Sequence, residues 1–371
     1  MATGFDQKLM YSLIKLAAKQ KGKTSPNPVV ASAVVRDGVV LAYGVHKGAG
    51  NPHAEVEALT QAGEAAKGST LYVTLEPCTY WGKTPPCTKA IIESGISEVV
   101  YAVDDPNPSV RHHPARHILE AAGIKVRQGV LANEAQVLNE VFFKNKLAQK
   151  PFVTLKAGIS LDGKIALSNF ESKYITGTAS LRQDHRLRRE HDAMLIGSGT
   201  ILADNPSLNV RFGLLKPGFK NPIKIILDLH ARVQPHLNVF SHNKDTKVIV
   251  VVSQNLVGEA RVKDLGKVAQ LWFLPEEKGH FVWEALLNKA YAEGIFSLLI
   301  EGGRGIYTSA LEAGVVDKFQ FFIAPKILGG AGDIGVFAGK NHNLLSDVTQ
   351  LAHVTSRKMG SDIWVTGYPQ R

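Results

Sequence analysis

Cysteine is nearly absent from this sequence, since only Cys78 and Cys87 occur among 371 residues. So few cysteines exclude the disulfide-rich secreted class, in which several bridges compensate for a small core. No run approaches the roughly eighteen apolar residues of a membrane span, and Asp6 and Lys8 interrupt the first apolar stretch, which argues against a signal peptide. A lipidation motif is also missing. These absences predict a soluble protein of the cytoplasm with no membrane partner.

Aromatic residues are scarce as well, at 8%, and the formal charge of +10 is spread without a long basic run. A basic stripe with interleaved stacking aromatics, typical of nucleic-acid surfaces, is therefore not indicated. The densest basic group, which fits an anionic substrate or a solvated helix face, is Arg182, His185, Arg186, Arg188 and Arg189. With 44% hydrophobic residues, the chain is long enough for two or more domains.

The two cysteines belong to one constellation with a histidine. It reads His53-Ala54-Glu55, then Pro77-Cys78 and, eight residues later, Cys87. One imidazole and two thiolates give zinc three protein ligands and leave a fourth position open for water, which is typical of a catalytic zinc. Glu55 can then shuttle protons, and the His-x-Glu plus Pro-Cys pattern is the one that zinc deaminases use on cytosine- or adenine-type rings.

The spacing of this motif also predicts local structure. Residues i and i+2 of a helix point about 200° apart, so His53 and Glu55 cannot both face one site from mid-helix. We therefore expect a helix to begin at about His53, and a second one to begin after Thr84-Pro85-Pro86, at Cys87. Two alternatives stay open at this point: buried structural cysteines, and a disulfide between Cys78 and Cys87.

The first half predicts an α/β domain. A helix at 6–20 precedes two strands at 29–35 and 39–45, which the turn signal Arg36-Asp37-Gly38 joins. Strands at 70–74, 98–103 and 125–129 then alternate with helices from His53, from Cys87, at 115–122 and at 132–147. Alternation implies crossover connections and a partly parallel sheet covered on both faces. The stretch Gln149-Lys150-Pro151 divides domains 1–149 and 150–371.

The second half restarts the pattern as a separate α/β domain. Strands are expected at 152–157, 193–197, 223–227, 247–252, 297–300 and 318–324, with the arginine-rich helix at 179–191. Two glycine-rich turns, Gly197-Ser198-Gly199-Thr200 and Glu301-Gly302-Gly303-Arg304-Gly305, each follow a strand. Such turns can cradle a phosphate, although neither has the full G-x-G-x-x-G fingerprint and each in isolation reads as a plain turn.

Motifs through both halves together resemble the bifunctional deaminase/reductase family of riboflavin biosynthesis. The zinc motif is shared by many deaminases, and its combination with the downstream motifs is far more specific. The matching segments are Pro26-Asn27-Pro28-Val29-Val30, His53-Ala54-Glu55, Glu76-Pro77-Cys78, Gly82-Lys83-Thr84-Pro85-Pro86-Cys87, Asp105-Pro106-Asn107-Pro108, Leu155-Lys156-Ala157, Ser160-Leu161-Asp162-Gly163, Ala203-Asp204-Asn205-Pro206, Glu301-Gly302-Gly303 and Ala324-Pro325-Lys326.

The resemblance implies a fold and a two-step reaction. The first domain would have the cytidine-deaminase-like three-layer αβα fold and, with zinc, hydrolyse the ring amine of 2,5-diamino-6-(5-phosphoribosylamino)pyrimidin-4-one. The second would be similar to dihydrofolate reductase, an α/β fold, and use NADPH to reduce the ribosyl group to ribityl. The cofactors would be one zinc per chain and NADPH, and we expect a homo-oligomer.

The resemblance also implies roles for individual residues. Its zinc ligands fall on His53, Cys78 and Cys87, its proton shuttle on Glu55, and its pyrimidine contacts on Asn27 and His46. The positions that match its NADPH contacts are Gly158, Tyr174, Thr200, Asp204, Gly303, Arg304 and Gly305. Those that match its reductase substrate contacts are Ser172, Arg188, Leu208, Arg211 and Glu301.

The sequence departs from the family pattern in three places. Ala31 stands where a glycine usually follows Asn-Pro-x-Val, Arg111-His112-His113-Pro114 replaces a glycine-rich turn, and Tyr174 replaces a tryptophan. Two other functions agree less well with the sequence. A nucleic-acid base deaminase would leave about 220 C-terminal residues without a role, and a zinc-stabilised binding protein would normally use four protein ligands.

Overall fold

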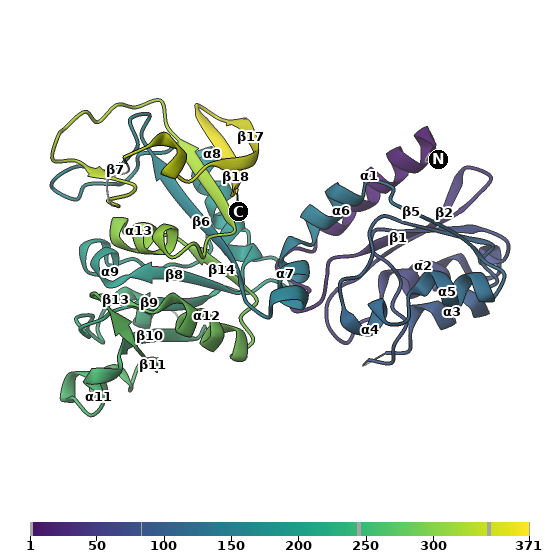
Figure 1. Ribbon diagram of the computed structural model, residues 1–371, viewed down its shortest axis with the longest axis horizontal. Helices are drawn as coiled ribbons and strands as arrows, with labels where there is room; N and C mark the ends of the chain where they lie inside the picture. The colour runs from purple at the N-terminus through teal and green to yellow at the C-terminus, as the bar shows by residue number, and fades with distance from the viewer. Residues whose placement is uncertain (1–2, 83, 243–245, 340–342, 371) are drawn as a thin grey trace. The chain divides into compact units, whose positions relative to one another are not determined.

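The structure, a computed structural model, describes residues 3–82, 84–242, 246–339 and 343–370. Lys83, which belongs to one of the motifs quoted above, lies outside the described residues. The chain divides into two units, Met1–Gln149 and Lys150–Arg371, and each has its own sheet and hydrophobic core (Figure 1). Among the described residues, no helix has both the length and the apolar composition required to cross a bilayer.

The sheet of the first unit has five strands in the order β2-β1-β3-β4-β5. The Asp37-Gly38 turn joins β1 and β2 as an antiparallel hairpin, whereas β3, β4 and β5 pair in parallel through crossover connections. The partly parallel sheet expected from the alternation of strands and helices is therefore confirmed. The strands are β1 (Ala31–Arg36), β2 (Val39–Val45), β3 (Thr70–Val73), β4 (Glu98–Tyr101) and β5 (Lys125–Gln128).

Helices cover both faces of this sheet, which confirms the three-layer arrangement (Figure 1). Side chains alternate along each strand, so that Val34 and Leu71 pack on one face while Val35 and Tyr72 pack on the other. The first face is covered by α2 (Ala54–Ala62), α3 (Cys87–Glu93) and α5 (Ala115–Ala121), and the second by α1 (Gly4–Ala18) and α6 (Ala132–Leu138). The short η1 (Gly63–Ala66) and α4 (Pro108–Arg111) lie in connections.

The single helix expected at 132–147 is wrong, because the chain breaks into α6 and α7 (Glu140–Ala148). Asn139 lies between them with φ −107° and ψ 23°. Its side-chain oxygen accepts the Val29 N–H at 2.9 Å, and its amide nitrogen donates to the Val29 carbonyl at 3.0 Å. A buried side chain that satisfies two backbone groups of a distant segment fixes its own backbone, and here it redirects the helix.

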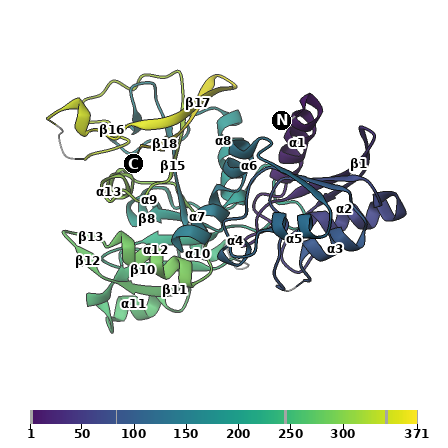
Figure 2. The same cartoon turned by 45° about the vertical axis from the view of Figure 1, so that its right-hand side comes forward.

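The second unit contains a nine-stranded sheet in the order β11-β10-β9-β8-β14-β6-β15-β18-β17. Figure 2 shows its C-terminal strands β17 and β18, which lie next to each other. The strands from β11 to β15 pair in parallel, and a C-terminal hairpin that the sequence pattern did not predict adds two antiparallel strands. The strands are β6 (Phe152–Ile159), β8 (Ala193–Gly197), β9 (Ile223–Leu227), β10 (Val248–Ser253), β11 (Gln270–Leu274), β14 (Ser297–Ile300), β15 (Lys318–Ile323), β17 (Leu351–Met359) and β18 (Asp362–Pro369).

Helices also cover both faces of the larger sheet, so both units have the expected α/β architecture. One core contains side chains of α12 (Trp283–Ala292) and α13 (Arg304–Glu312). The other contains side chains of α8 (Thr178–Glu190), α9 (Ser198–Asp204), α10 (Asn238–Ser241) and α11 (Ala260–Leu265). The remaining short elements are β7 (Lys164–Ala166), β16 (Ile334–Gly335), β12 (Glu276–Glu277), β13 (His280–Phe281), η2 (Gln254–Leu256) and η3 (Leu345–Asp347).

The start of α2 lies directly against β2, at a point where only glycine fits. A Cβ atom added to Gly44 would lie 1.9 Å from the Ala54 carbonyl oxygen and 2.6 Å from the Ala58 nitrogen. Ser32 donates from its hydroxyl to the same Ala54 carbonyl at 2.6 Å. The position of α2, and so of the residues on either side of Ala54, is set by this backbone contact.

We predict that Gly44→Ala displaces α2 and destabilises the first unit by at least the ~1–3 kcal/mol typical of overpacking, since the clash is with backbone atoms. Calorimetry should show a lower unfolding temperature. Gly4→Ala is the control, because a Cβ there meets no atom within 4 Å. A Gly44→Ala protein as stable as the Gly4→Ala protein would contradict the proposed packing constraint.

Candidate active sites

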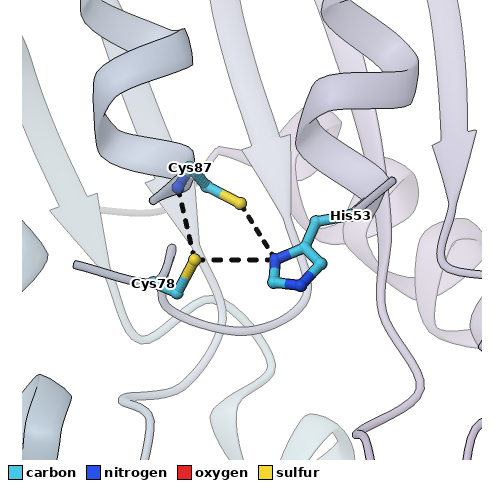
Figure 3. A group of neighbouring side chains, drawn as sticks. All are labelled: His53, Cys78 and Cys87. Atoms are coloured by element: carbon cyan, nitrogen blue, oxygen red, sulfur yellow. Dashed lines mark hydrogen bonds between the residues drawn. The ribbon is translucent and has the colours of Figure 1, made fainter. Parts of the chain in front are cut away.

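Three metal-binding side chains converge at the beginnings of α2 and α3, as the motif predicted. His53 is the N-cap of α2, Cys87 is the first residue of α3, and Cys78 lies in the connection after β3. Their ligand atoms all lie within 4.8 Å of one another. The His53 Nδ1 atom is 3.1 Å from the Cys87 sulfur and 3.5 Å from the Cys78 sulfur, and both sulfurs face the ring (Figure 3).

The donor set fits zinc, and both cysteines are free thiols rather than a disulfide. The Cys87 side chain, the His53 ring and the Cys87 backbone N–H all hydrogen-bond the Cys78 sulfur, and they lower the pKa of this thiol to about 5 despite its burial. The pKa of Cys87 is raised, because its thiol donates to Cys78 and is buried. Cys78 is therefore ready to bind a cation as a thiolate, and Cys87 releases its proton when a cation binds.

Glu55 lies in the first turn of α2 beside these ligands, and only 4% of its surface is exposed. Burial raises the pKa of its carboxyl above the usual value. A carboxyl with a raised pKa holds its proton more readily than an ordinary one, which suits general acid–base chemistry. Glu55, His53 and Cys78 line the same pocket, so the candidate metal ligands and the candidate acid–base group share one site.

Asn27 and His46, the predicted pyrimidine contacts, line the same pocket. The Nδ1 atom of His46 lies 3.1 Å from the Pro52 carbonyl oxygen, which can only accept, so this nitrogen carries the proton. The other ring nitrogen, Nε2, then accepts from the Asn27 amide nitrogen at 3.0 Å. Burial lowers the pKa of His46, which favours this neutral ring. The bond fixes the orientation of the Asn27 amide.

The pocket also contains residues that the sequence analysis did not assign to a site. Asp105 follows β4, and its pKa is raised to about 6, mainly by burial. Glu76 accepts the backbone N–H of Asp105 at 3.0 Å and that of Ala115 at 2.8 Å, and so ties two connections together. The motifs Glu76-Pro77-Cys78 and Asp105-Pro106-Asn107-Pro108 were the signals available for these two residues. Tyr80, Phe142 and Lys146 also line the pocket and were not assigned to a site from the sequence.

In the second unit, the two glycine-rich turns meet. They follow β8 and β14, which are neighbouring parallel strands, so both turns lie at the same sheet edge. A Cβ atom on Gly303 would lie 3.3 Å from the Thr200 hydroxyl, and one on Gly197 would lie 2.9 Å from Ile306. Gly303 has φ +86° and is the N-cap of α13, which begins at Arg304 and Gly305. Each turn is weak evidence alone, but together they form a glycine-lined edge at the carboxyl ends of the strands.

A cluster of four charged side chains lies beside this edge. Arg188 binds Glu301 through two hydrogen bonds of 2.8 and 2.6 Å, and Lys156 contacts Asp184 at 2.7 Å. Lys156 is 3.7 Å from Glu301, and Arg188 is 3.4 Å from Asp184. The four side chains are at most 11% exposed. Burial opposes ionisation of Asp184, but Lys156 and Arg188 hold its pKa below the usual value. Arg188 is thus already paired with protein carboxylates.

Arg211 and Leu208 lie together in the loop after α9. The Arg211 N–H donates to the His185 Nδ1 atom at 3.0 Å, and burial with nearby Arg188 lowers the pKa of that histidine to about 4, so the ring accepts as a neutral group. Leu208 is buried with φ +57°, whereas the Arg211 side chain is exposed.

The other predicted residues of this unit lie on separate segments. A Cβ on Gly158 of β6 would lie 3.1 Å from the Thr176 methyl group. Tyr174 is exposed, and its carbonyl accepts from the Lys326 ammonium at 2.9 Å. Asp204 ends α9 and is 3.3 Å from the Lys173 ammonium, and the Ser172 carbonyl accepts the Ile175 N–H.

Two protein families match consecutive parts of the chain. The cytidine and deoxycytidylate deaminase zinc-binding region matches residues 3–103. The RibD C-terminal domain matches residues 151–365. The first match contains all three metal ligands and Glu55, and the second contains both glycine-rich turns and the four-charge cluster.

Curated relatives and solved structures match almost the whole chain. The riboflavin biosynthesis protein RibD of Aquifex aeolicus is 43% identical over 91% of this chain and 92% of its own length. RibD of Escherichia coli is 36% identical over 96% and 98%. Among solved structures, the Thermotoga maritima diaminohydroxyphosphoribosylaminopyrimidine deaminase/5-amino-6-(5-phosphoribosylamino)uracil reductase has a TM-score of 0.85 and 33% identity, with 98% of each chain covered. Acinetobacter baumannii RibD has a TM-score of 0.85 and 32% identity, with 99% of each chain covered. The chain therefore belongs to the RibD family of riboflavin biosynthesis proteins.

Proposed function

We propose that this protein carries out two consecutive steps of riboflavin biosynthesis. Unit Met1–Gln149 deaminates 2,5-diamino-6-(5-phosphoribosylamino)pyrimidin-4-one, and unit Lys150–Arg371 reduces the ribosyl group of the product with NADPH. The observation that carries the proposal is the pocket in which Glu55 lies beside His53 and Cys78. The two activities named for the Thermotoga maritima protein support the same two steps for this chain.

For deamination, we assign His53, Cys78 and Cys87 as zinc ligands and Glu55 as the proton shuttle. Zinc, when bound, acts as a Lewis acid that makes water a nucleophile at neutral pH. Glu55 accepts one proton from the attacking water and delivers it to a ring nitrogen. It then takes the second proton, from the hydroxyl formed at the reacting carbon, and delivers it to the amine, which leaves as ammonia while the carbonyl forms. Burial of Glu55 supports this role, since a raised pKa lets the carboxyl both take and return the proton.

Asn27 and His46 divide the recognition of the ring between them. His46 holds the Asn27 amide nitrogen, so the amide presents its oxygen and its remaining N–H in a fixed direction. A fixed donor–acceptor pair suits a pyrimidine edge, which offers complementary groups side by side. In this proposal Asn27 contacts the substrate, and His46 holds the Asn27 side chain in place.

For reduction, we assign the glycine-lined edge to NADPH. We assign the pyrophosphate there because Gly199 and Gly305 have open space beside them and the N-terminus of α13 offers N–H groups. NADPH supplies the hydride, and the protein binds and orients the two reactants. The assigned cofactor contacts are Gly158, Tyr174, Thr200, Asp204, Gly303, Arg304 and Gly305.

The substrate side of the reductase is assigned to Ser172, Arg188, Leu208, Arg211 and Glu301. Arg188 is buried and paired with Glu301, so it orients that carboxylate toward the sugar hydroxyls. Arg211 has an exposed side chain on a loop that His185 holds by its backbone. We therefore assign the phosphate mainly to Arg211, whose guanidinium matches a phosphate with two hydrogen bonds.

We further propose that the protein works in the cytoplasm as a homo-oligomer. Free thiols suit a reducing compartment. Self-association is supported by the apolar side chains exposed along the edge strand β2, where Val39, Leu41 and Tyr43 are 61%, 39% and 45% exposed.

The proposed function is tested with purified protein and the diaminopyrimidine phosphate. We expect ammonia release without NADPH, and NADPH oxidation only after deamination. Removal of zinc by a chelator should stop ammonia release but leave reduction of the deaminated intermediate, because the two units have separate cores. If chelation removed both activities while circular dichroism showed an intact fold, the assignment of the two reactions to separate units would be contradicted.

Glu55→Gln tests the shuttle, since glutamine keeps the size of the side chain but cannot accept the proton of water. We expect the zinc content to stay near that of the wild type while deamination falls by the ~10²–10⁴-fold typical of general acid–base groups. Glu57→Gln on the same helix is the control, because Glu57 bonds to Lys47 and Val45 rather than lining the pocket. Near-normal turnover by Glu55→Gln would remove Glu55 from the mechanism.

Arg211→Ala tests phosphate recognition in the reductase. Loss of a charge-assisted hydrogen bond worth roughly 1.5–3 kcal/mol lowers kcat/KM about ten- to a hundredfold. The deaminase activity should not change, and dephosphorylated substrate should respond little. Arg186→Ala, which removes an exposed arginine of α8, is the matched control. Equal losses on phosphorylated and dephosphorylated substrates would show a role other than phosphate binding.

A further inference from the structure

The pocket that contains Glu55 runs from a buried end to an exposed rim. Glu55 is 4% exposed at the inner end, whereas Lys146 of α7 has an exposed side chain and still lines the pocket. Phe142, one turn earlier on α7, forms part of the wall and belongs to the core of the unit. The Lys146 ammonium lies 5.6 Å from the centroid of the Phe142 ring, a cation–π contact that keeps it beside the opening.

Lys146 is the only lysine or arginine among the described residues that line this pocket. The two lining histidines do not replace it, since His46 is held neutral by its bonds and His53 is assigned to the metal. Among the residues that the structure describes, the fixed positive charge of this pocket is therefore that of Lys146, at its rim.

The carboxyl groups that line the pocket form no ion pair with Lys146. Both oxygens of Glu76 accept backbone N–H groups, and Asp105 accepts the N–H of Asn107 at 2.8 Å. Glu55 lies at the buried end, beside Cys87. Burial raises the pKa of Asp105, and the nearby charge of Lys146 offsets a small part of that rise. Lys146 itself forms no ion pair with a described residue.

The proposed substrate has an uncharged reacting group and a charged phosphate, which suit the buried end and the exposed rim of the pocket. Its reacting amine, on C2, must lie at the buried end beside Glu55, and its ribose phosphate, a dianion at neutral pH, is carried on another ring carbon, C6, at the end of a long side chain. A phosphate that remains at the exposed rim keeps part of its hydration and meets the ammonium there.

We propose that Lys146 binds the phosphate monoester of the deaminase substrate and thereby selects phosphorylated pyrimidines over their nucleoside forms. This inference rests on the proposed deaminase function. It assigns Lys146 to substrate binding rather than to the chemical step, so its contribution belongs to KM.

Lys146→Met, which keeps the length of the side chain and removes its charge, is the decisive variant. With phosphorylated substrate we expect the deaminase KM to rise about five- to tenfold at low salt with kcat nearly unchanged, because the contact is exposed and partly screened. Ribose 5-phosphate should inhibit the wild type competitively and Lys146→Met more weakly. Lys146→Arg should restore most of the affinity.

Two controls separate the charge from the helix. Lys144→Met removes a lysine from the same helix that does not line the pocket, and its KM should stay within about twofold of the wild type. Reduction of the deaminated, phosphorylated intermediate by Lys146→Met should be unchanged, since Lys146 lies in the other unit.

The outcomes are distinct. A KM effect confined to phosphorylated substrate supports the proposal. An unchanged KM in Lys146→Met, or equal losses on the phosphorylated and dephosphorylated substrates, overturns it while leaving the deaminase function intact. Failure of the zinc-loaded wild type to release ammonia from either substrate overturns the proposed function and this inference with it.

Discussion

The contact between β2 and α2 is the constraint on which the first active site depends. Gly44 lets the Ala54 carbonyl approach the strand backbone, and Ser32 holds that carbonyl from the neighbouring strand. His53 and Glu55 flank Ala54, so one candidate metal ligand and the proposed proton shuttle are positioned by backbone packing. The metal site is thereby fixed on the rigid sheet, which limits the reorganisation needed when a cation binds.

In the second unit, polar side chains are held in position by ion pairs. Lys156, Arg188, Asp184 and Glu301 come from β6, α8 and the end of β14, and their charges cancel. Such buried groups are costly unless each has a partner, and removal of one leaves another unpaired. The cluster therefore ties three elements together at the edge where the two glycine-rich turns meet. One unit orients its polar groups by backbone packing, and the other by mutual electrostatic pairing.

The sequence predicted features that are encoded locally. The metal ligands, both helix starts and the bounds of β2, β8, β9 and β14 follow from residue type and short-range periodicity. It could not predict the break at Asn139, because the cause is Val29, 110 residues away. The Arg188–Glu301 pair joins residues 113 positions apart, so the sequence pattern could not predict it either. The hairpin β17–β18 was missed because most of β17 is exposed and its apolar signal is weak.

The clamp of Asn139 on Val29 has a consequence for the design of the first unit. The matched deaminase zinc-binding region ends at residue 103 and already contains all three metal ligands. Phe142 and Lys146 lie beyond it, and Asn139 attaches their segment to Val29, two residues before β1 begins. The metal ligands and this wall of the pocket therefore come from separate stretches of the chain. Substitutions at residues 142 and 146 change the wall while the metal ligands keep their positions, which makes this segment the place to redesign specificity.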